Sequence, residues 1–135
     1  MSQTADSRQQ TAKLDVYSKS RKKFQNVDSL RAYQLFKEIF STENIRDFQS
    51  ENICINIFED LQHQVLYGLG AGFYSFNLTH KKQLYLRARE ALGAFIATAK
   101  FYELGEKNLI KEIEENLISA LSALIKKLEN KIEKN

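Results

Sequence analysis

Apolar residues recur every three or four positions in four stretches of the chain, and this period predicts four amphipathic helices. The stretches cover residues 28–40, 50–74, 79–104 and 106–132. No stretch alternates apolar and polar residues in the way that a half-buried strand does. Since each helix would have one apolar stripe, we expect an all-α protein, an antiparallel up-down four-helix bundle that buries the four stripes together.

Three of the stripes are long enough to be followed residue by residue. The stripe in residues 50–74 repeats every four positions through Ile53, Ile57, Leu61, Val65 and Leu69, and Phe58 and Phe73 widen it. The stripe in residues 79–104 consists of Leu84, Ala88, Ala91, Leu92, Phe95 and Ala99. The stripe in residues 106–132 approximates a heptad seam through Ile110, Ile113, Leu117, Leu121, Leu124 and Leu128.

Polar residues and one glycine mark the expected helix ends. Asp28 and Ser29 are favourable N-caps for the first helix, and Thr79 is one for the third. Gly105 is expected to end the third helix.

Three glycines, Gly68, Gly70 and Gly72, lie close together near the end of the second helix. A glycine inside a helix costs about 1 kcal/mol relative to alanine. Gly68 and Gly72 share a face, which indicates either a close approach of a neighbouring helix or fraying of this helix end. A phosphate-binding loop is not favoured, because no strand precedes the glycines and no Lys-Ser/Thr pair follows them.

Composition narrows the class of protein. The chain has 135 residues, no proline and one cysteine, so an internal disulfide is excluded and few chain breaks are obligatory. The length fits one domain, which we place at residues 28–135 after an arm at residues 1–27. No apolar run is long enough to span a membrane, and the first residues lack an apolar signal core, so a cytoplasmic location is expected.

Positive charge is concentrated in the arm and in the third helix. The arm is polar and is expected to be flexible, with a net charge of +4. Its basic cluster consists of Lys19, Arg21, Lys22 and Lys23. Such a segment is either a solvated tail or an arm that binds phosphates without reading sequence.

Residues 79–104 have a net charge of +3, and three of their cations are expected to share one helix edge. Lys82, Arg89 and Lys100 are 7 and 11 residues apart, both close to whole numbers of helical turns. A row of cations on a rigid helix can follow a phosphate backbone. The alternative is an ordinary charged flank that forms salt bridges between helices.

Catalytic and metal sites are not favoured. Glu59 and His63 are four residues apart and can meet on a helix surface, but the two Glu-x-x-His motifs of a di-metal bundle are missing. We expect His80 to be exposed and Cys54 to be a buried structural residue. No arginine precedes either histidine at the spacing found in helical ribonucleases of the HEPN type. We therefore expect no enzyme activity, no cofactor and no metal.

The second half of the chain resembles a known group of proteins. The stretch THKKQLYLRAREALGAFIATAKFYELGEKNLIKEIEENLISALSALIKKL is similar to four-helix bundle proteins encoded in intervening sequences of 23S ribosomal RNA genes. The matching positions are Lys81, Lys82, Ala88, Ala91, Gly93, Leu121, Leu124, Ile125 and Leu128. The accessory variability determinant of diversity-generating retroelements looks like the same bundle, and QVLYGLGAG is similar to its middle. The chain has no counterpart of the Ser-Ile-Pro-x-Asn-Ile-Ala-Glu-Gly segment of the first group, which favours the second.

The resemblance implies a non-enzymatic adaptor that binds nucleic acid, RNA rather than DNA, and assists a reverse transcriptase. It also implies a homo-oligomer, with a pentamer as first choice. The residues expected to contact phosphates are Lys81, Lys82, Arg87, Arg89, Lys100, Lys19, Arg21, Lys22 and Lys23. The alternatives are a protein-interaction subunit, such as a small helical subunit of an RNA-guided CRISPR complex, or a ribosomal intervening-sequence protein of unknown role.

Overall fold

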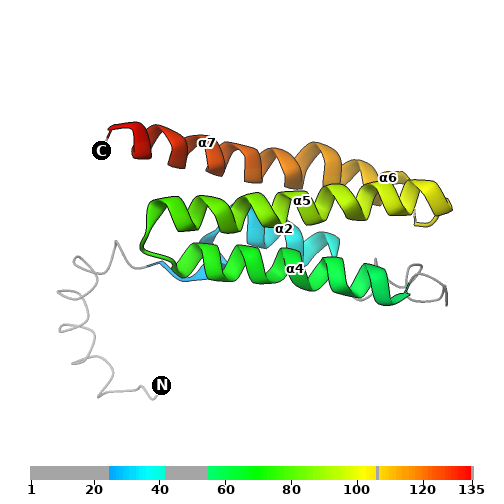
Figure 1. Ribbon diagram of the computed structural model, residues 1–135. Helices are drawn as coiled ribbons and strands as arrows, with labels where there is room; N and C mark the ends of the chain where they lie inside the picture. Colours follow the sequence, from blue (N-terminus) through cyan, green and yellow to red (C-terminus); the bar gives the residue numbers. More distant parts are fainter. Residues whose placement is uncertain (1–24, 42–54, 106, 135) are drawn as a thin grey trace, which may run out of the picture.

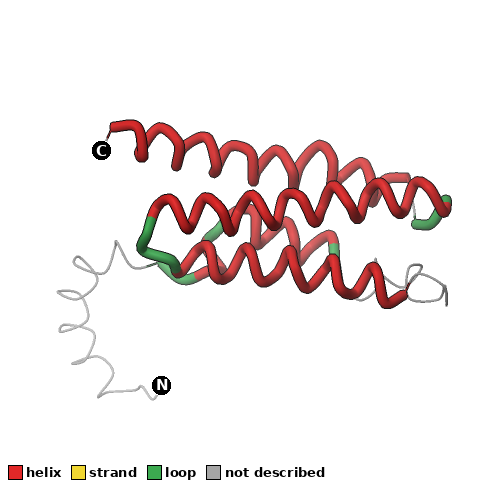
Figure 2. Tube along the Cα trace, in the orientation of Figure 1, coloured by secondary structure: helices red, strands yellow, loops and turns green. Residues whose placement is uncertain are grey.

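A computed structural model describes residues 25–41, 55–105 and 107–134 of the chain. The all-α class is confirmed, because every regular element within these residues is helical (Figure 2). In chain order the elements are η1 (Val27–Ser29), α2 (Arg31–Ile39), α4 (Ile55–Tyr74), α5 (Leu78–Tyr102), α6 (Lys107–Glu112), η2 (Ile113–Leu117) and α7 (Ile118–Lys134).

The long helices lie side by side with nearly parallel axes, and α2 lies behind them (Figure 1). A connection of three residues, Ser75–Asn77, joins α4 to α5. The segments α6, η2 and α7 follow one another as a single long rod beside α5. The connection between α4 and α5, the C-terminal end of α7 and the start of η1 therefore lie at the same end of the molecule.

Aromatic rings hold the centre of the core together. The ring of Phe95 in α5 is 0% exposed and lies 4.9 Å from the ring of Phe58 in α4. It also lies 5.1 Å from the ring of Phe40, which follows α2, in an edge-to-face arrangement. Such pairs add about 0.5–1.5 kcal/mol each beyond the area that they bury. Three helices thus meet at one buried side chain.

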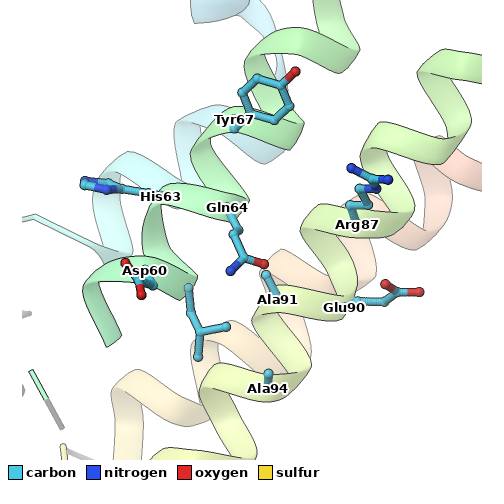
Figure 3. A pocket seen from close by; sticks show the side chains of 9 residues that line it. Asp60, His63, Gln64, Tyr67, Arg87, Glu90, Ala91 and Ala94 are labelled. Atoms are coloured by element: carbon cyan, nitrogen blue, oxygen red, sulfur yellow. The ribbon is translucent and has the colours of Figure 1, made fainter. Parts of the chain in front are cut away.

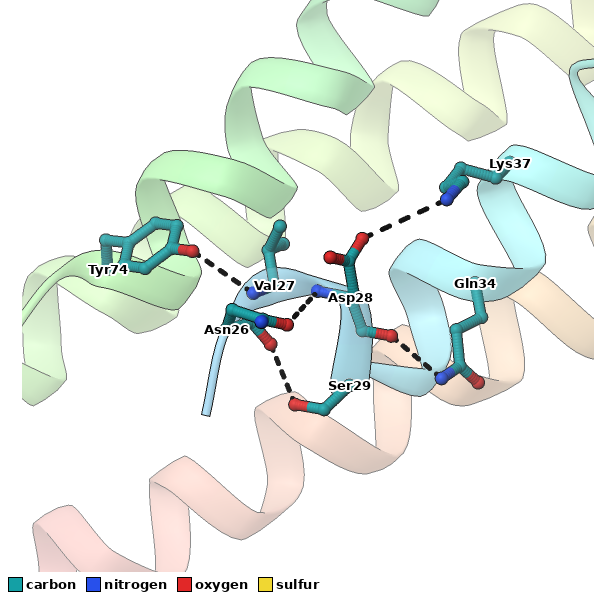
Figure 4. A network of polar contacts seen from close by, with 7 residues as sticks. All are labelled: Asn26, Val27, Asp28, Ser29, Gln34, Lys37 and Tyr74. Carbon is teal, nitrogen blue, oxygen red and sulfur yellow. Dashed lines mark hydrogen bonds and ion pairs between the residues drawn. The ribbon is translucent and has the colours of Figure 1, made fainter. Parts of the chain in front are cut away.

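The first helix is not capped as the sequence predicted. The Asn26 side chain caps η1 and accepts a hydrogen bond of 3.1 Å from the backbone N–H of Asp28 (Figure 4). The N-cap of α2 is Leu30, which makes no side-chain capping bond, so the prediction of Asp28 and Ser29 as caps was wrong. The Ser29 hydroxyl instead donates to the backbone oxygen of Asn26 over 2.8 Å. Asp28 and Ser29, which were expected to cap the helix, thus belong to the 3-10 helix that precedes α2.

The ends of α5 also differ from expectation. Its N-cap is Asn77, whose side chain accepts from the backbone N–H of His80 over 2.8 Å, so Thr79 lies inside the helix. Its C-cap is Glu103, which adopts the left-handed conformation at φ 54°. Gly105, the predicted stop, has φ 80° but comes two residues after this cap. Asparagine is as good an N-cap as threonine, and the structure uses the earlier one.

The predicted stripe of α4 is partly wrong. Val65 and Leu69 are 0% exposed, whereas Ile57 is 46% exposed and Phe58 takes the core position. The repeat of four residues drifts about 40° per step around a helix of 3.6 residues per turn, so the stripe leaves the core face. The predicted first member, Ile53, lies outside the described residues.

Close helix packing explains the glycines of α4. A Cβ atom at Gly68 would lie 2.7 Å from the backbone oxygen of Leu84. One at Gly72 would lie 2.7 Å from the ring of Tyr85, whereas one at Gly70 would meet nothing within 4 Å. Since α4 continues to Tyr74, close approach of α5 is confirmed and fraying is not the reason for these residues.

The fourth helix is interrupted by a π-helical segment, η2, which the sequence did not predict. Ile113, Leu117 and Leu121 are each 0% exposed although they are spaced by four residues. In a regular α-helix these steps would rotate the side chains away from the core by about 40° each. The wider π turn removes part of this drift, so the buried seam stays against α5 and α2.

Candidate nucleic-acid interface

Two of the three cations that were predicted to share one edge of α5 are paired with carboxylates of the C-terminal rod. The Nζ atom of Lys82 lies 3.1 Å from a carboxylate oxygen of Glu129 in α7. The Nζ atom of Lys100 lies 2.9 Å from a carboxylate oxygen of Glu114 in η2. Arg89, on the same edge by its spacing, forms no ion pair with another described residue. The alternative of a charged flank with salt bridges between helices therefore describes the edge at Lys82 and Lys100.

These ion pairs reduce the charge that the α5 edge offers to a ligand. Lys82 and Glu129 are 26% and 45% exposed, and Lys100 and Glu114 are 58% and 43% exposed, so water screens both pairs. Such pairs contribute about 0–1 kcal/mol to stability. A phosphate group that approached Lys82 or Lys100 would have to compete with the carboxylate already paired there. Of the three cations of this edge, only Arg89 has a positive charge that no described carboxylate balances.

Lys81 has a structural partner rather than a free ammonium group. Its Nζ donates a hydrogen bond of 2.8 Å to the backbone oxygen of Phe73, near the end of α4. The ammonium also lies 5.6 Å from the Phe73 ring centre and 5.9 Å from that of Tyr85. Burial lowers the pKa of Lys81, and the positive charge of Lys131 lowers it further. Lys81 thus bonds to a free carbonyl group at the C-terminal end of α4. Its interaction with Lys131 shows that Lys131 lies nearby.

Arg87 lies on the opposite side of α5, where a groove of about 680 Å³ separates it from α4. The residues that line this groove are Asp60, Leu61, His63, Gln64, Tyr67, Arg87, Glu90, Ala91 and Ala94. In Figure 3 His63 points away from α5 and Glu90 points away from α4. The charged groups therefore do not converge, and the groove offers no acid–base pair. The phosphate-contact set predicted on α5 is split between two surfaces.

The structure adds no support for a metal site. The described residues contain no group of three His, Cys, Asp or Glu side chains that could hold a metal ion. Glu59 and His63 are both exposed, and so is His80. Cys54 lies outside the described residues. Among the helices that the structure describes, none is both long and apolar enough to cross a membrane.

Sequence reasoning missed a row of three lysines on α7, which we call the C-terminal lysine row: Lys127, Lys131 and Lys134. Their spacings of 4 and 3 put them on one face of the helix, and all three are exposed. None of them forms an ion pair with another described residue. Their spacing was the available signal, but the sequence analysis considered only the cations of the arm and of residues 79–104.

The C-terminal end of α7, which carries the lysine row, lies at the same end of the molecule as the start of η1 (Figure 1). The backbone N–H of Val27 donates to the Tyr74 hydroxyl over 3.1 Å, which fixes η1 against the end of α4. The arm cations Lys19, Arg21, Lys22 and Lys23 lie outside the described residues.

Comparison with known proteins adds no relative to this picture. No protein-family model matches the chain, and neither the curated proteins nor the solved structures gave a significant match.

Proposed function

We propose that this protein is a non-enzymatic adaptor that binds nucleic acid through the C-terminal lysine row, with the cations of the arm as a second source of phosphate contacts. The observation that supports this most is the contrast between two sets of cations. Lys82 and Lys100 are paired with carboxylates, whereas Lys127, Lys131 and Lys134 have no ion-pair partner among the described residues. Unpaired lysines on a rigid helix can neutralise phosphates without first giving up a carboxylate.

RNA is the proposed nucleic acid, and a reverse transcriptase is the proposed protein partner, as the sequence resemblance implies. The adaptor would work as a cytoplasmic homo-oligomer. Phosphate contacts of this kind hold and orient a strand but do not select its sequence. Selection would then come from the partner enzyme or from the shape of the RNA.

The finer fold assignment is part of this proposal. We assign the chain to the antiparallel up-down four-helix bundles, with α2, α4, α5 and the α6–η2–α7 rod as the four members. The short connection of three residues between α4 and α5 supports this, since short loops join antiparallel neighbours. The length of α2, nine residues, is the main departure from a regular bundle.

Two matched triple variants test the location of the interface. One replaces Lys127, Lys131 and Lys134 by glutamine, and the other replaces Lys82, Arg89 and Lys100 by glutamine. Both remove three positive charges, so their net charge is the same. Binding of a labelled RNA is measured by fluorescence anisotropy over a range of salt concentrations, and circular dichroism checks the fold.

We expect the variant of the C-terminal lysine row to lower the salt slope of log K by about 2 to 3. The variant of the α5 edge should lower it by about 1, because only Arg89 lacks a carboxylate partner among the described residues. The reverse order would move the interface to the α5 edge. Equal, unchanged slopes in both variants would contradict the proposal, and deletion of residues 1–24 then shows whether the arm alone binds.

A protein-interaction subunit is the second candidate, and the groove between α4 and α5 favours it. Tyr67 is 65% exposed on one wall, and Ala91 and Ala94 form the other. Residues 91–99 of α5 contain no charged side chain, although Ala94 is exposed. An uncharged exposed face beside an aromatic residue is typical of surfaces that contact other proteins. In the proposed adaptor, this face is where copies of the chain meet.

A further inference from the structure

Phe76 is the large apolar side chain that stands furthest out of the described surface. Its side chain is 97% exposed, in the connection between α4 and α5. Full burial of a phenylalanine side chain is worth about 2–3 kcal/mol, so a ring left in water has no folding role to explain it. The ring is therefore free to contact a ligand.

The connection that holds Phe76 is well fixed. Ser75 on one side donates its backbone N–H to the Gly72 oxygen over 3.2 Å. Asn77 on the other side caps α5 through the His80 N–H. The residues next to Phe76 are thus tied to both helices, and the ring projects from an ordered turn.

Two lysines lie near this turn. The Lys81 ammonium donates to the backbone oxygen of Phe73, three residues before Phe76, and Lys131 lies close enough to lower the pKa of Lys81. The C-terminal end of α7 and the start of η1 lie at the same end of the molecule as the connection (Figure 1). An exposed aromatic ring at the same end of a molecule as unpaired lysines is suited to single strands, since the ring can stack on a base while the cations contact the backbone.

We propose that Phe76 is a stacking platform for an unpaired base, so that the protein binds single-stranded nucleic acid in preference to duplex. This inference rests on the proposed nucleic-acid function. A duplex keeps its base faces stacked within the helix, so only its phosphates can reach this end of the molecule. A single strand presents free base faces and gains the stacking contact in addition.

Phe101 provides a matched control. It is 78% exposed, but it lies near the C-terminal end of α5, at the other end of the molecule. Its ring packs edge-to-face against that of Tyr102 at 4.9 Å. A change at Phe101 therefore alters exposed aromatic surface without touching the proposed interface.

The chain contains no tryptophan, so one introduced residue gives an unambiguous fluorescence signal. The experiment uses Phe76→Trp and Phe101→Trp in the full chain, with a labelled 12-nucleotide single-stranded RNA and a blunt duplex of the same length. Anisotropy of the label reports binding, and tryptophan emission reports stacking. We expect the single strand to quench Phe76→Trp on binding, the duplex to bind without quenching it, and Phe101→Trp to remain unchanged.

A second pair of variants measures the energetic effect. Phe76→Ala should weaken single-strand binding about tenfold and leave duplex binding unchanged, whereas Phe101→Ala should change neither. Phe76→Tyr should restore the affinity, because a tyrosine ring stacks equally well. Thermal unfolding should not change in Phe76→Ala, since the side chain is almost fully exposed.

The outcomes separate this inference from the function on which it rests. Binding by anisotropy without quenching of Phe76→Trp, or equal loss of duplex and single-strand binding in Phe76→Ala, overturns the stacking role alone. Absence of binding to either nucleic acid at low salt overturns the nucleic-acid function, and the stacking role with it.

Discussion

Gly68 in α4 lets the α4 and α5 backbones approach each other more closely than any other residue would allow. At Gly68 an added Cβ atom would lie 2.7 Å from a backbone oxygen, which cannot move unless α5 moves. We expect Gly68→Ala to lower the free energy of unfolding by about 1–3 kcal/mol, since overpacking outweighs the gain in helix propensity. Chemical denaturation followed by circular dichroism measures the change.

Gly70 provides the control for this prediction in the same helix. A Cβ atom there would meet nothing within 4 Å, so only the backbone entropy changes. Gly70→Ala should raise the free energy of unfolding by about 0.5–1 kcal/mol. If both substitutions stabilised the protein, the close approach of α5 at Gly68 would not be a constraint on the fold.

Glu103 ends α5 in a conformation that L-amino acids avoid. Its φ of 54° is left-handed, which costs a residue with a side chain about 1–2 kcal/mol relative to glycine. Glu103 makes no ion pair with another described residue, so its replacement removes no such contact. We therefore expect Glu103→Gly to raise the melting temperature, as measured by thermal unfolding. A lower melting temperature would mean that the glutamate side chain stabilises the turn.

Tyr85 makes the stability of the protein depend on alkaline pH. Burial raises the pKa of the Tyr85 hydroxyl from its ordinary 10.0 to about 12. Between these values the folded protein keeps a proton that the unfolded chain releases, so its stability decreases as pH rises through this window. In Tyr85→Phe this part of the decrease should disappear. Urea unfolding midpoints of both proteins, measured at pH values from below the ordinary tyrosine pKa up to the raised pKa, test this prediction. Identical dependence of the two midpoints on pH would contradict it.

At the scale of elements, the π turn η2 is equivalent to one extra residue in an otherwise regular rod. Deletion of Glu115, which is exposed within η2, should convert the segment to α-helix while Ile113 and Leu121 keep their faces. We expect this variant to fold with a stability within about 1 kcal/mol of the parent. Circular dichroism and denaturant unfolding measure both properties.

Deletion of Ala123, which is exposed in α7, is the matched control. It rotates the following residues by about 100°, so Ile125 and Leu128 leave the core. This variant should lose most of its stability. If the two deletions had equal effects, η2 would not be the place where the register of the helix is adjusted.

The sequence predicted the elements better than it predicted their contacts. Period alone placed the helices, because each needs an apolar stripe, and the stripe around Phe95 is buried as expected. Ile57 was placed in the core wrongly, because residues repeated every four positions rotate gradually around an α-helix. The π-helical segment η2 was not predicted, because a pattern of apolar residues does not show where the helix changes its number of residues per turn. Both errors are differences of less than one turn, which only packing against a neighbour decides.

The candidate site was less predictable, because ion pairs depend on residues far apart in the chain. Lys82 pairs with Glu129, which is 47 positions later, so its spacing relative to Arg89 and Lys100 gave no sign of this partner. The C-terminal lysine row could have been found from its spacings of 4 and 3. The closeness of Lys131 to Lys81, however, follows only from the way that α5 and α7 pack.

At the scale of the whole molecule, the proposed functions occupy different surfaces. Basic groups and Phe76 lie at one end, and the groove lies along the side between α4 and α5. Copies of the chain that met through the groove would leave every basic end free. A homo-oligomer would therefore present several phosphate-binding ends to one strand, and linked binding sites raise the overall affinity for a long RNA without new contacts.

This arrangement predicts that the oligomer and nucleic-acid binding can be separated by one substitution. Ala94 is exposed and lines the groove, so Ala94→Arg introduces a charge where copies would meet without disturbing the core. We expect the parent to have a mass several times the 15.7 kDa of one chain, and Ala94→Arg to have the mass of one chain, by light scattering after gel filtration. A short RNA that spans one basic end should bind both proteins alike, whereas a long RNA should bind the variant more weakly, because the gain from linked sites is lost. A parent with the mass of one chain at micromolar concentration would contradict the homo-oligomer and leave the groove to a different protein.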